Sequence, residues 1–138
     1  MTIKQLTETI EKIASKKPNI NYVGVGNVYD LNSKPDVKYS VLYITPSKTD
    51  VYENEVTHSV TIFFIDRLTD NLDNKLEIQS NGTREITNII NHLTNTEDVE
   101  VNYPLSFTPF NQRFADDCAG VFATITFSVE GEGLCFFE

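Results

Sequence analysis

Residues that carry catalytic and metal chemistry are scarce in this sequence. Its 138 residues include two cysteines, two histidines and no tryptophan. Cys118 and Cys135 are too few and too far apart for a zinc knuckle or a redox motif, and neither His58 nor His92 has another metal ligand at a suitable spacing nearby. The Gly-x-Ser-x-Gly motif is also missing. We therefore expect no enzyme, no metal and no cofactor, although a Cys–His pair or a carboxylate pair assembled only by the fold stays open.

Basic side chains are also few, and long apolar runs are absent. The 20 acids outnumber the 11 bases and give a net charge of −9. This balance argues against a surface that grips nucleic acid, but it is compatible with a protein past which DNA slides. No stretch approaches the ~18 apolar residues that span a bilayer, so we expect no membrane contact. The amphipathic N-terminal segment contains acids, unlike a signal or transit peptide, which indicates a protein made in the cytoplasm.

The N-terminal segment is predicted to form an amphipathic helix over residues 3 to about 16. Thr2 and Gln5 fit a capping box at its start, and Pro18 follows its end. Its apolar residues recur at helical spacing, namely Ile3, Leu6, Ile10 and Ile13.

Three strands are predicted next, over residues 20–29, 37–44 and 55–65. Gly24 in the first strand indicates a bend or a close backbone approach. Pro46 is expected to end the second strand, so that the polar residues after it form a loop projecting from the sheet. The second and third strands would then form an antiparallel hairpin. In the third strand one face is predicted to hold Val56, His58, Val60, Ile62 and Phe64, and the other face Thr57, Ser59, Thr61 and Phe63.

The second half of the chain is predicted to contain a helical region and two more strands. The helical region covers residues 72–94, and either one helix through Gly82 or two shorter helices would fit it. Strands are expected over 98–103 and 121–129. The chain is thus predicted to contain two helices and about five strands in the order α-β-β-β-α-β-β. We predict one α+β domain over residues 1–138, with a mainly antiparallel sheet packed against the helices.

Aromatic residues gather in two segments without a clear period. Residues 104–118 hold three phenylalanines beside one arginine and two aspartates, and the tail, residues 130–138, ends in an apolar run. These rings either fold back on the core or form a contact surface. Together with the predicted projecting loop over 46–54, they give the candidate subunit interface: Val51, Tyr52, Phe107, Phe110, Arg113, Phe114, Asp116, Asp117, Leu134, Phe136 and Phe137.

Two long stretches resemble a family of phage proteins. They are VTIFFIDRLTDNLDNKLEIQSNGTREITNIINHL, from Val60 to Leu93, and FTPFNQRFADDCAGVFATITFSV, from Phe107 to Val129. Both are similar to tail-terminator and head-to-tail connector proteins (neck or tail rings) of tailed bacteriophages, of the type found in phages of Bacteroidetes hosts. The resemblance covers most of the chain.

This resemblance implies a structural virion subunit without a cofactor. Such a subunit is made in the host cytoplasm and forms a closed ring of six or twelve copies at the head-to-tail joint or the tail end. Its partners would be portal, connector or tail-tube proteins, and DNA would pass through the lumen without specific binding. The alternative is a small soluble adaptor module that binds another protein and performs no catalysis.

Overall fold

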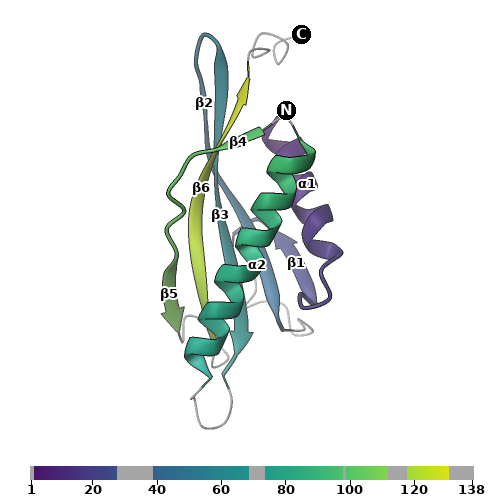
Figure 1. Cartoon of the computed structure of the whole chain (residues 1–138), viewed down its shortest axis with the longest axis vertical. Helices are drawn as coiled ribbons and strands as arrows, with labels where there is room; N and C mark the ends of the chain where they lie inside the picture. The colour runs from purple at the N-terminus through teal and green to yellow at the C-terminus, as the bar shows by residue number, and fades with distance from the viewer. Residues whose placement is uncertain (1, 28–38, 69–73, 98, 112–117, 131–138) are drawn as a thin grey trace.

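The chain forms two layers, a mixed sheet and a pair of helices that cover one of its faces (Figure 1). The computed structural model describes residues 2–27, 39–68, 74–97, 99–111 and 118–130. The predicted α+β class and order of elements are confirmed, with one additional short strand. In the described part of the chain, no helix is long and apolar enough to cross a membrane.

Along the chain, each helix is followed by three strands. Their bounds are α1 Ile3–Ser15, β1 Tyr22–Val25, β2 Val41–Val51, β3 Glu55–Arg67, α2 Lys75–Thr96, β4 Val99–Val101, β5 Thr108–Asn111 and β6 Cys118–Glu130.

The first helix, α1, begins with the predicted capping box. The Gln5 backbone N–H donates to Thr2 Oγ1 over 3.2 Å, and the Thr2 N–H donates to Gln5 Oε1 over 2.9 Å. Two of the helix's otherwise unpaired amide groups are therefore satisfied by side chains. The apolar stripe of α1 is buried through Leu6, Ile10 and Ala14.

The second helix, α2, is one continuous helix, which decides between the two alternatives. Gly82 lies where α2 packs closely against the sheet. A Cβ at this position would lie 2.7 Å from Val121 Cγ2 and 2.9 Å from Phe64 Cδ1. Leu76 belongs to the helix but is exposed, and Leu72 falls outside the described residues. The buried stripe consists of Ile78, Ile86, Ile89, Ile90 and Leu93.

The sheet has the order β1-β2-β3-β6-β4, and β5 pairs with the same edge of β6 as β4. All neighbours are antiparallel except β1 and β2, which are parallel. The sheet is therefore mixed rather than wholly antiparallel. Residues 26–40 provide a connection of the length that a parallel pair requires.

Strand β2 extends further than predicted. The sequence indicated that Pro46 ends this strand, but β2 runs on to Val51. Pro46 pairs with Val60 and Lys48 pairs with Ser59, so one residue on β2 is extra at this point. A β-bulge of this kind lets a strand continue past a proline that cannot donate to the ladder. The predicted projecting loop is therefore the outer half of the β2–β3 hairpin.

The two faces of the sheet carry different cores, as the alternation in β3 predicted. The helix-covered face packs Val60, Ile62 and Phe64 against α1 and α2 in the main core. Gly24 of β1 shows the expected close approach, since a Cβ there would collide with the ring of Tyr43. The opposite face holds a smaller cluster made of Val41, Tyr43, Phe63, Ile65, Phe110 and Cys118.

Candidate subunit interface

The β2–β3 hairpin reaches beyond the ends of both helices (Figure 1). Its strands stay paired up to Val51 and Val56. The Tyr52 N–H then donates to the Glu55 carbonyl over 2.8 Å, so that only Glu53 and Asn54 form the turn. A two-residue turn of this kind keeps the two strands of a hairpin in register. The hairpin is thus an ordered arm rather than a loop.

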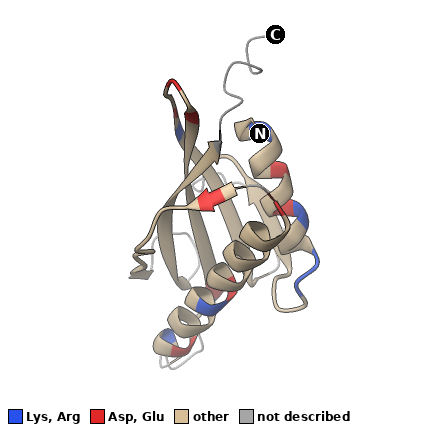
Figure 2. Cartoon of the chain, turned by 45° about the horizontal axis from the view of Figure 1, so that its top comes forward, with Lys and Arg blue, Asp and Glu red and all other residues tan. Residues whose placement is uncertain are grey.

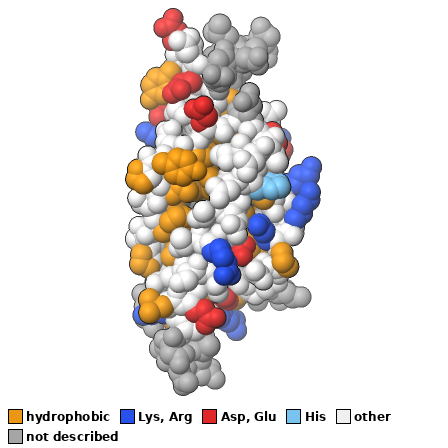
Figure 3. All heavy atoms as spheres, viewed as in Figure 1, with side chains coloured by type: hydrophobic (Ala, Val, Ile, Leu, Met, Phe, Trp, Pro, Cys, Tyr) orange, Lys and Arg blue, Asp and Glu red, His pale blue; other side chains and the backbone are white. Residues whose placement is uncertain are grey.

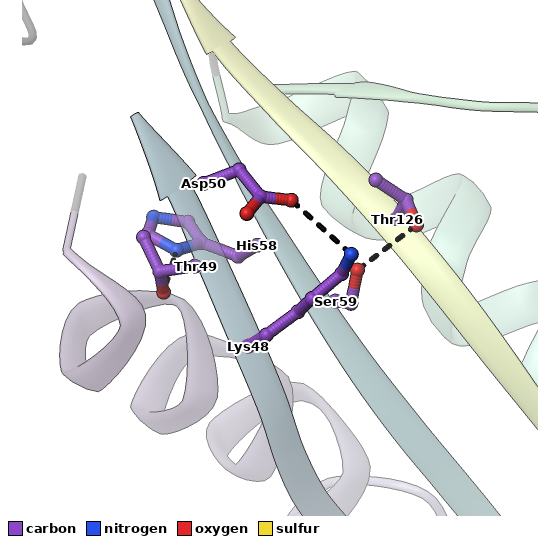
Figure 4. A network of polar contacts seen from close by, with 6 residues as sticks. All are labelled: Lys48, Thr49, Asp50, His58, Ser59 and Thr126. Carbon is purple, nitrogen blue, oxygen red and sulfur yellow. Dashed lines mark hydrogen bonds and ion pairs between the residues drawn. The ribbon is translucent and has the colours of Figure 1, made fainter. Parts of the chain in front are cut away.

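Side-chain contacts fasten the arm across its strands (Figure 4). Thr49 Oγ1 and His58 Nδ1 lie 2.9 Å apart in a hydrogen bond, and His58 is only 1% exposed. On the next strand pair, the hydroxyls of Ser59 and Thr126 lie 3.1 Å apart. His58, which was predicted to share a strand face with apolar residues, is therefore buried and hydrogen-bonded.

The tip of the arm combines apolar and acidic side chains. Val51 and Tyr52 are 55% and 56% exposed, and the acids Glu53 and Glu55 beside them are also exposed. Figure 2 shows these acidic positions at the turn of the hairpin. Solvent-exposed apolar side chains at the end of an ordered arm are typical of a contact surface. Val51 and Tyr52 are thus accessible, as an interface requires.

The acid nearest the arm's bulge already has a partner. Lys48 Nζ lies 3.4 Å from Asp50 Oδ2, with both side chains partly exposed (Figure 4). Exposed pairs of this type contribute at most about 1 kcal/mol. Among the described residues neither Glu53 nor Glu55 has an ion pair, so these two glutamates supply the unpaired negative charge of the tip.

The predicted aromatic residues of the second segment divide between core and surface. Phe110 of β5 is 8% exposed, and its ring centroid lies 6.2 Å from Phe63 and 6.1 Å from Phe122. Phe107 is half-buried against the main core. Of the two readings offered by the sequence, folding back on the protein holds for Phe110.

An apolar edge lies beside Phe107 that the sequence did not single out. Tyr103, between β4 and β5, is 67% exposed, and Pro104 and Pro109 are exposed as well. Figure 3 shows apolar side chains along this edge of the molecule. Because proline lacks an N–H, Pro109 makes the edge a poor template for another strand. Contact here would use side chains rather than backbone pairing.

The other predicted interface residues fall outside the described part of the chain. They are Arg113, Phe114, Asp116, Asp117, Leu134, Phe136 and Phe137.

The candidate Cys–His pairs are not formed by Cys118. This buried cysteine pairs with Arg67, nine positions along β3 from His58, which separates them by about 30 Å. His92 lies on α2, on the far side of the sheet from the cluster that contains Cys118. Cys135 is outside the described residues. Among the described residues, no three His, Cys, Asp or Glu side chains are grouped closely enough to hold a metal ion.

Two carboxylates line a polar cleft of about 350 Å³ between α2 and the segment after α1. Asp66 accepts hydrogen bonds from Ser40 Oγ at 2.9 Å and from the Arg67 N–H at 2.8 Å. Glu85 is 4% exposed and accepts from Asn19 Nδ2 at 3.2 Å. Each carboxylate is thus held by a contact that ties two segments together, which is a structural role.

A basic groove of about 510 Å³ lies between the two helices, which run in opposite directions. Lys12, Lys16 and Lys17 line it from the end of α1 and the residues after it, and His92 and Glu97 line it from α2 and its C-cap. Within the described part of the chain, none of the three lysines has an ion pair or a side-chain hydrogen bond. The groove is a local concentration of positive charge on an acidic protein.

No known protein-family model matches the sequence, and no curated protein shows significant similarity to it.

Proposed function

We propose that this chain is a ring-forming structural subunit of a tailed bacteriophage, placed at the head-to-tail joint or the tail end. DNA passes through the ring, and neighbouring portal, connector or tail-tube proteins contact it. The proposal starts from the resemblance of residues 60–93 and 107–129 to tail-terminator and connector proteins.

The observation that carries the proposal is the ordered arm with exposed Val51 and Tyr52 at its tip. A monomer gains nothing by holding two apolar side chains in water at the end of a fixed hairpin. The apolar edge around Tyr103 and the basic groove between the helices are further exposed surfaces, each different from the tip. A ring needs two different patches on each subunit, because one patch meets the other on the neighbour until the rotation closes.

The charge balance also suits a DNA channel. With a net charge of −9, the subunit repels phosphates and so discourages DNA from sticking to it. A ring whose channel is lined by lysine and arginine side chains would contradict this part of the proposal.

The test is the oligomeric state of the purified protein over a range of concentrations, measured by mass photometry together with negative-stain microscopy. We expect rings of uniform diameter with six or twelve copies. The double variant Val51→Ser/Tyr52→Ser should weaken assembly, because exposed anchors of this type contribute about 1–3 kcal/mol each in an interface.

A matched control is available at the opposite end of the molecule. Leu76 lies in the first turn of α2 and is 77% exposed, so Leu76→Ser removes a comparable apolar side chain from another surface. The control should assemble as the unmodified protein does. A protein that stays monomeric at every concentration would contradict the ring proposal and favour the adaptor module.

A further inference from the structure

The two charged features of the surface are complementary in sign. The tip of the β2–β3 hairpin presents Glu53 and Glu55 without a partner in the described chain, beside Tyr52. The groove between α1 and α2 presents Lys12 and Lys16, equally without partners. Figure 2 shows the acidic positions at the turn of the hairpin and the basic ones at the far end of α1. One subunit therefore carries both an acidic projection and a basic recess.

The groove can also accept an aromatic side chain. Ile13 and Pro18 are among its lining residues, and its three lysines outnumber the single acid, Glu97. Its surface is therefore part apolar and net basic. Tyr52 is 56% exposed and stands next to the acids of the tip, which gives the tip the same combination. Aromatic anchors seated among complementary charges are the usual composition of a specific contact.

The apolar edge is a poorer match for the tip. Residues 99–111, which include Tyr103, contain no lysine or arginine. The two glutamates would lose water there without gaining a countercharge, which is unfavourable. Electrostatic complementarity therefore selects the groove between the helices rather than the edge.

The tip cannot enter the groove of its own subunit. The arm extends away from the helices at one end of the molecule, whereas the groove lies on the helix layer (Figure 1). A contact between them joins two copies in a head-to-tail manner, and such a contact repeats until it closes a ring.

We propose that the hairpin tip of one subunit, with Tyr52, Glu53 and Glu55, docks in the groove of the next subunit against Lys12, Lys16 and Lys17. This inference rests on the proposed ring function and identifies the interface that builds the ring. The occupant of the groove is a second copy of this chain.

A charge-swap experiment tests the contact. Glu53→Lys/Glu55→Lys makes the tip basic, and Lys12→Glu/Lys16→Glu makes the groove acidic. All four residues are exposed, so both variants should fold. Each variant alone opposes like charges and should raise the concentration needed for assembly by at least about tenfold. Mixed in equal amounts, the two should assemble again, because each basic tip then meets an acidic groove and each acidic tip a basic groove.

A control variant separates this contact from an effect of net charge. Lys4→Glu/Arg84→Glu changes the net charge by the same amount as Lys12→Glu/Lys16→Glu, at two exposed positions that do not line the groove. It should assemble as the unmodified protein does. Salt should weaken the unmodified ring, since the screening length falls from about 10 Å at 0.1 M to about 3 Å at 1 M.

The outcomes distinguish the two proposals. If the unmodified protein forms rings and both charge variants still form them, the hairpin–groove contact is wrong while the ring function stands. If the separate variants fail and their mixture also fails, the contact is likewise overturned. If the unmodified protein forms no rings at any concentration, both proposals fail. Displacement of subunits from the ring by a short DNA duplex would assign the groove to phosphates and overturn the contact.

Discussion

Replacing Gly82 with alanine probes the contact between α2 and the sheet. The new methyl group would lie 2.7 Å from Val121 Cγ2, 2.9 Å from Phe64 Cδ1 and 3.1 Å from Phe64 Cβ. Ordinary carbon–carbon contacts are about 3.5–4.0 Å. The helix therefore has to move away from the sheet, or the two neighbours have to shift.

Two opposing effects set the size of the change. Alanine favours a helix over glycine by about 1 kcal/mol. Inserting a methyl group into a well-packed core costs about 1–3 kcal/mol. Val121 is β-branched, and one of the contacts to Phe64 is to its Cβ, which is fixed to the strand backbone. Both side chains are 2% exposed, so neither can easily move away from the new methyl group. We place the cost in the upper half of that range, which leaves a net destabilisation of about 1–2 kcal/mol.

Thermal and urea unfolding measure this effect directly. A chain of 138 residues has an unfolding entropy of roughly 290 cal/mol/K, so 1 kcal/mol lowers the Tm by about 3–4 °C. Ser80→Ala is the matched control, because Ser80 is exposed on the same helix and gains only helix propensity, a few tenths of a kcal/mol. If Gly82→Ala raises the Tm as Ser80→Ala does, the close approach of α2 to the sheet is wrong.

Two further substitutions test the opposite face and the arm. Phe110→Ala should lower the free energy of unfolding in urea by about 3–4 kcal/mol, because it leaves a cavity in the aromatic cluster. Tyr103→Ala on the exposed edge should change this free energy by less than about 0.5 kcal/mol. Thr49→Val should lower the free energy of unfolding by about 1–2 kcal/mol, because it removes the hydrogen bond to buried His58. Thr124→Val, which breaks an exposed hydroxyl pair, should lower it by clearly less. Equal losses would contradict the role given to burial.

The helices and β3 could be predicted because their signals are local. The helical period of residues 3–16 and the capping box of Thr2 lie within a few residues of one another, so neighbouring positions determine them. The alternation in β3 likewise placed His58 among core residues and the threonines on the other face. Local patterns could not decide whether the helix continues through Gly82. Only the short distance between α2 and the sheet explains why a glycine suits a continuous helix there.

The strands that were missed or misjudged depend on their partners. Pro46 ends a strand by local rules, yet β2 continues because β3 pairs with it on both sides of the bulge. The parallel pairing of β1 also follows from where β2 lies, not from the composition of β1. Strand β5, within an aperiodic segment, exists because β6 is long enough to pair with both β4 and β5.

The surface was harder to predict than the fold, because exposure is a property of packing. Phe110 and Tyr103 are aromatic residues in the same region, yet β5 turns Phe110 into the cluster with Phe63 while Tyr103 stays in solvent between two strands. Residue type alone does not predict that one is buried and the other exposed. Val51 and Tyr52 are exposed because the strands around them end at a tight turn. The position of that turn depends on the continuation of β2 beyond Pro46, which local sequence rules do not predict.

The basic groove shows the same limit most clearly. In the sequence, the polar side of α1 mixes Lys4, Glu8 and Glu11 with the later lysines and favours no partner. Packing separates these charges. Lys4, Glu8 and Glu11 lie along the side of α1 next to β1, whereas Lys12 and Lys16 face α2. The C-terminal end of α2 lines the same groove through His92 and Thr96, followed by Glu97. Three lysines against one glutamate therefore form a net positive surface from two segments that are distant in the chain.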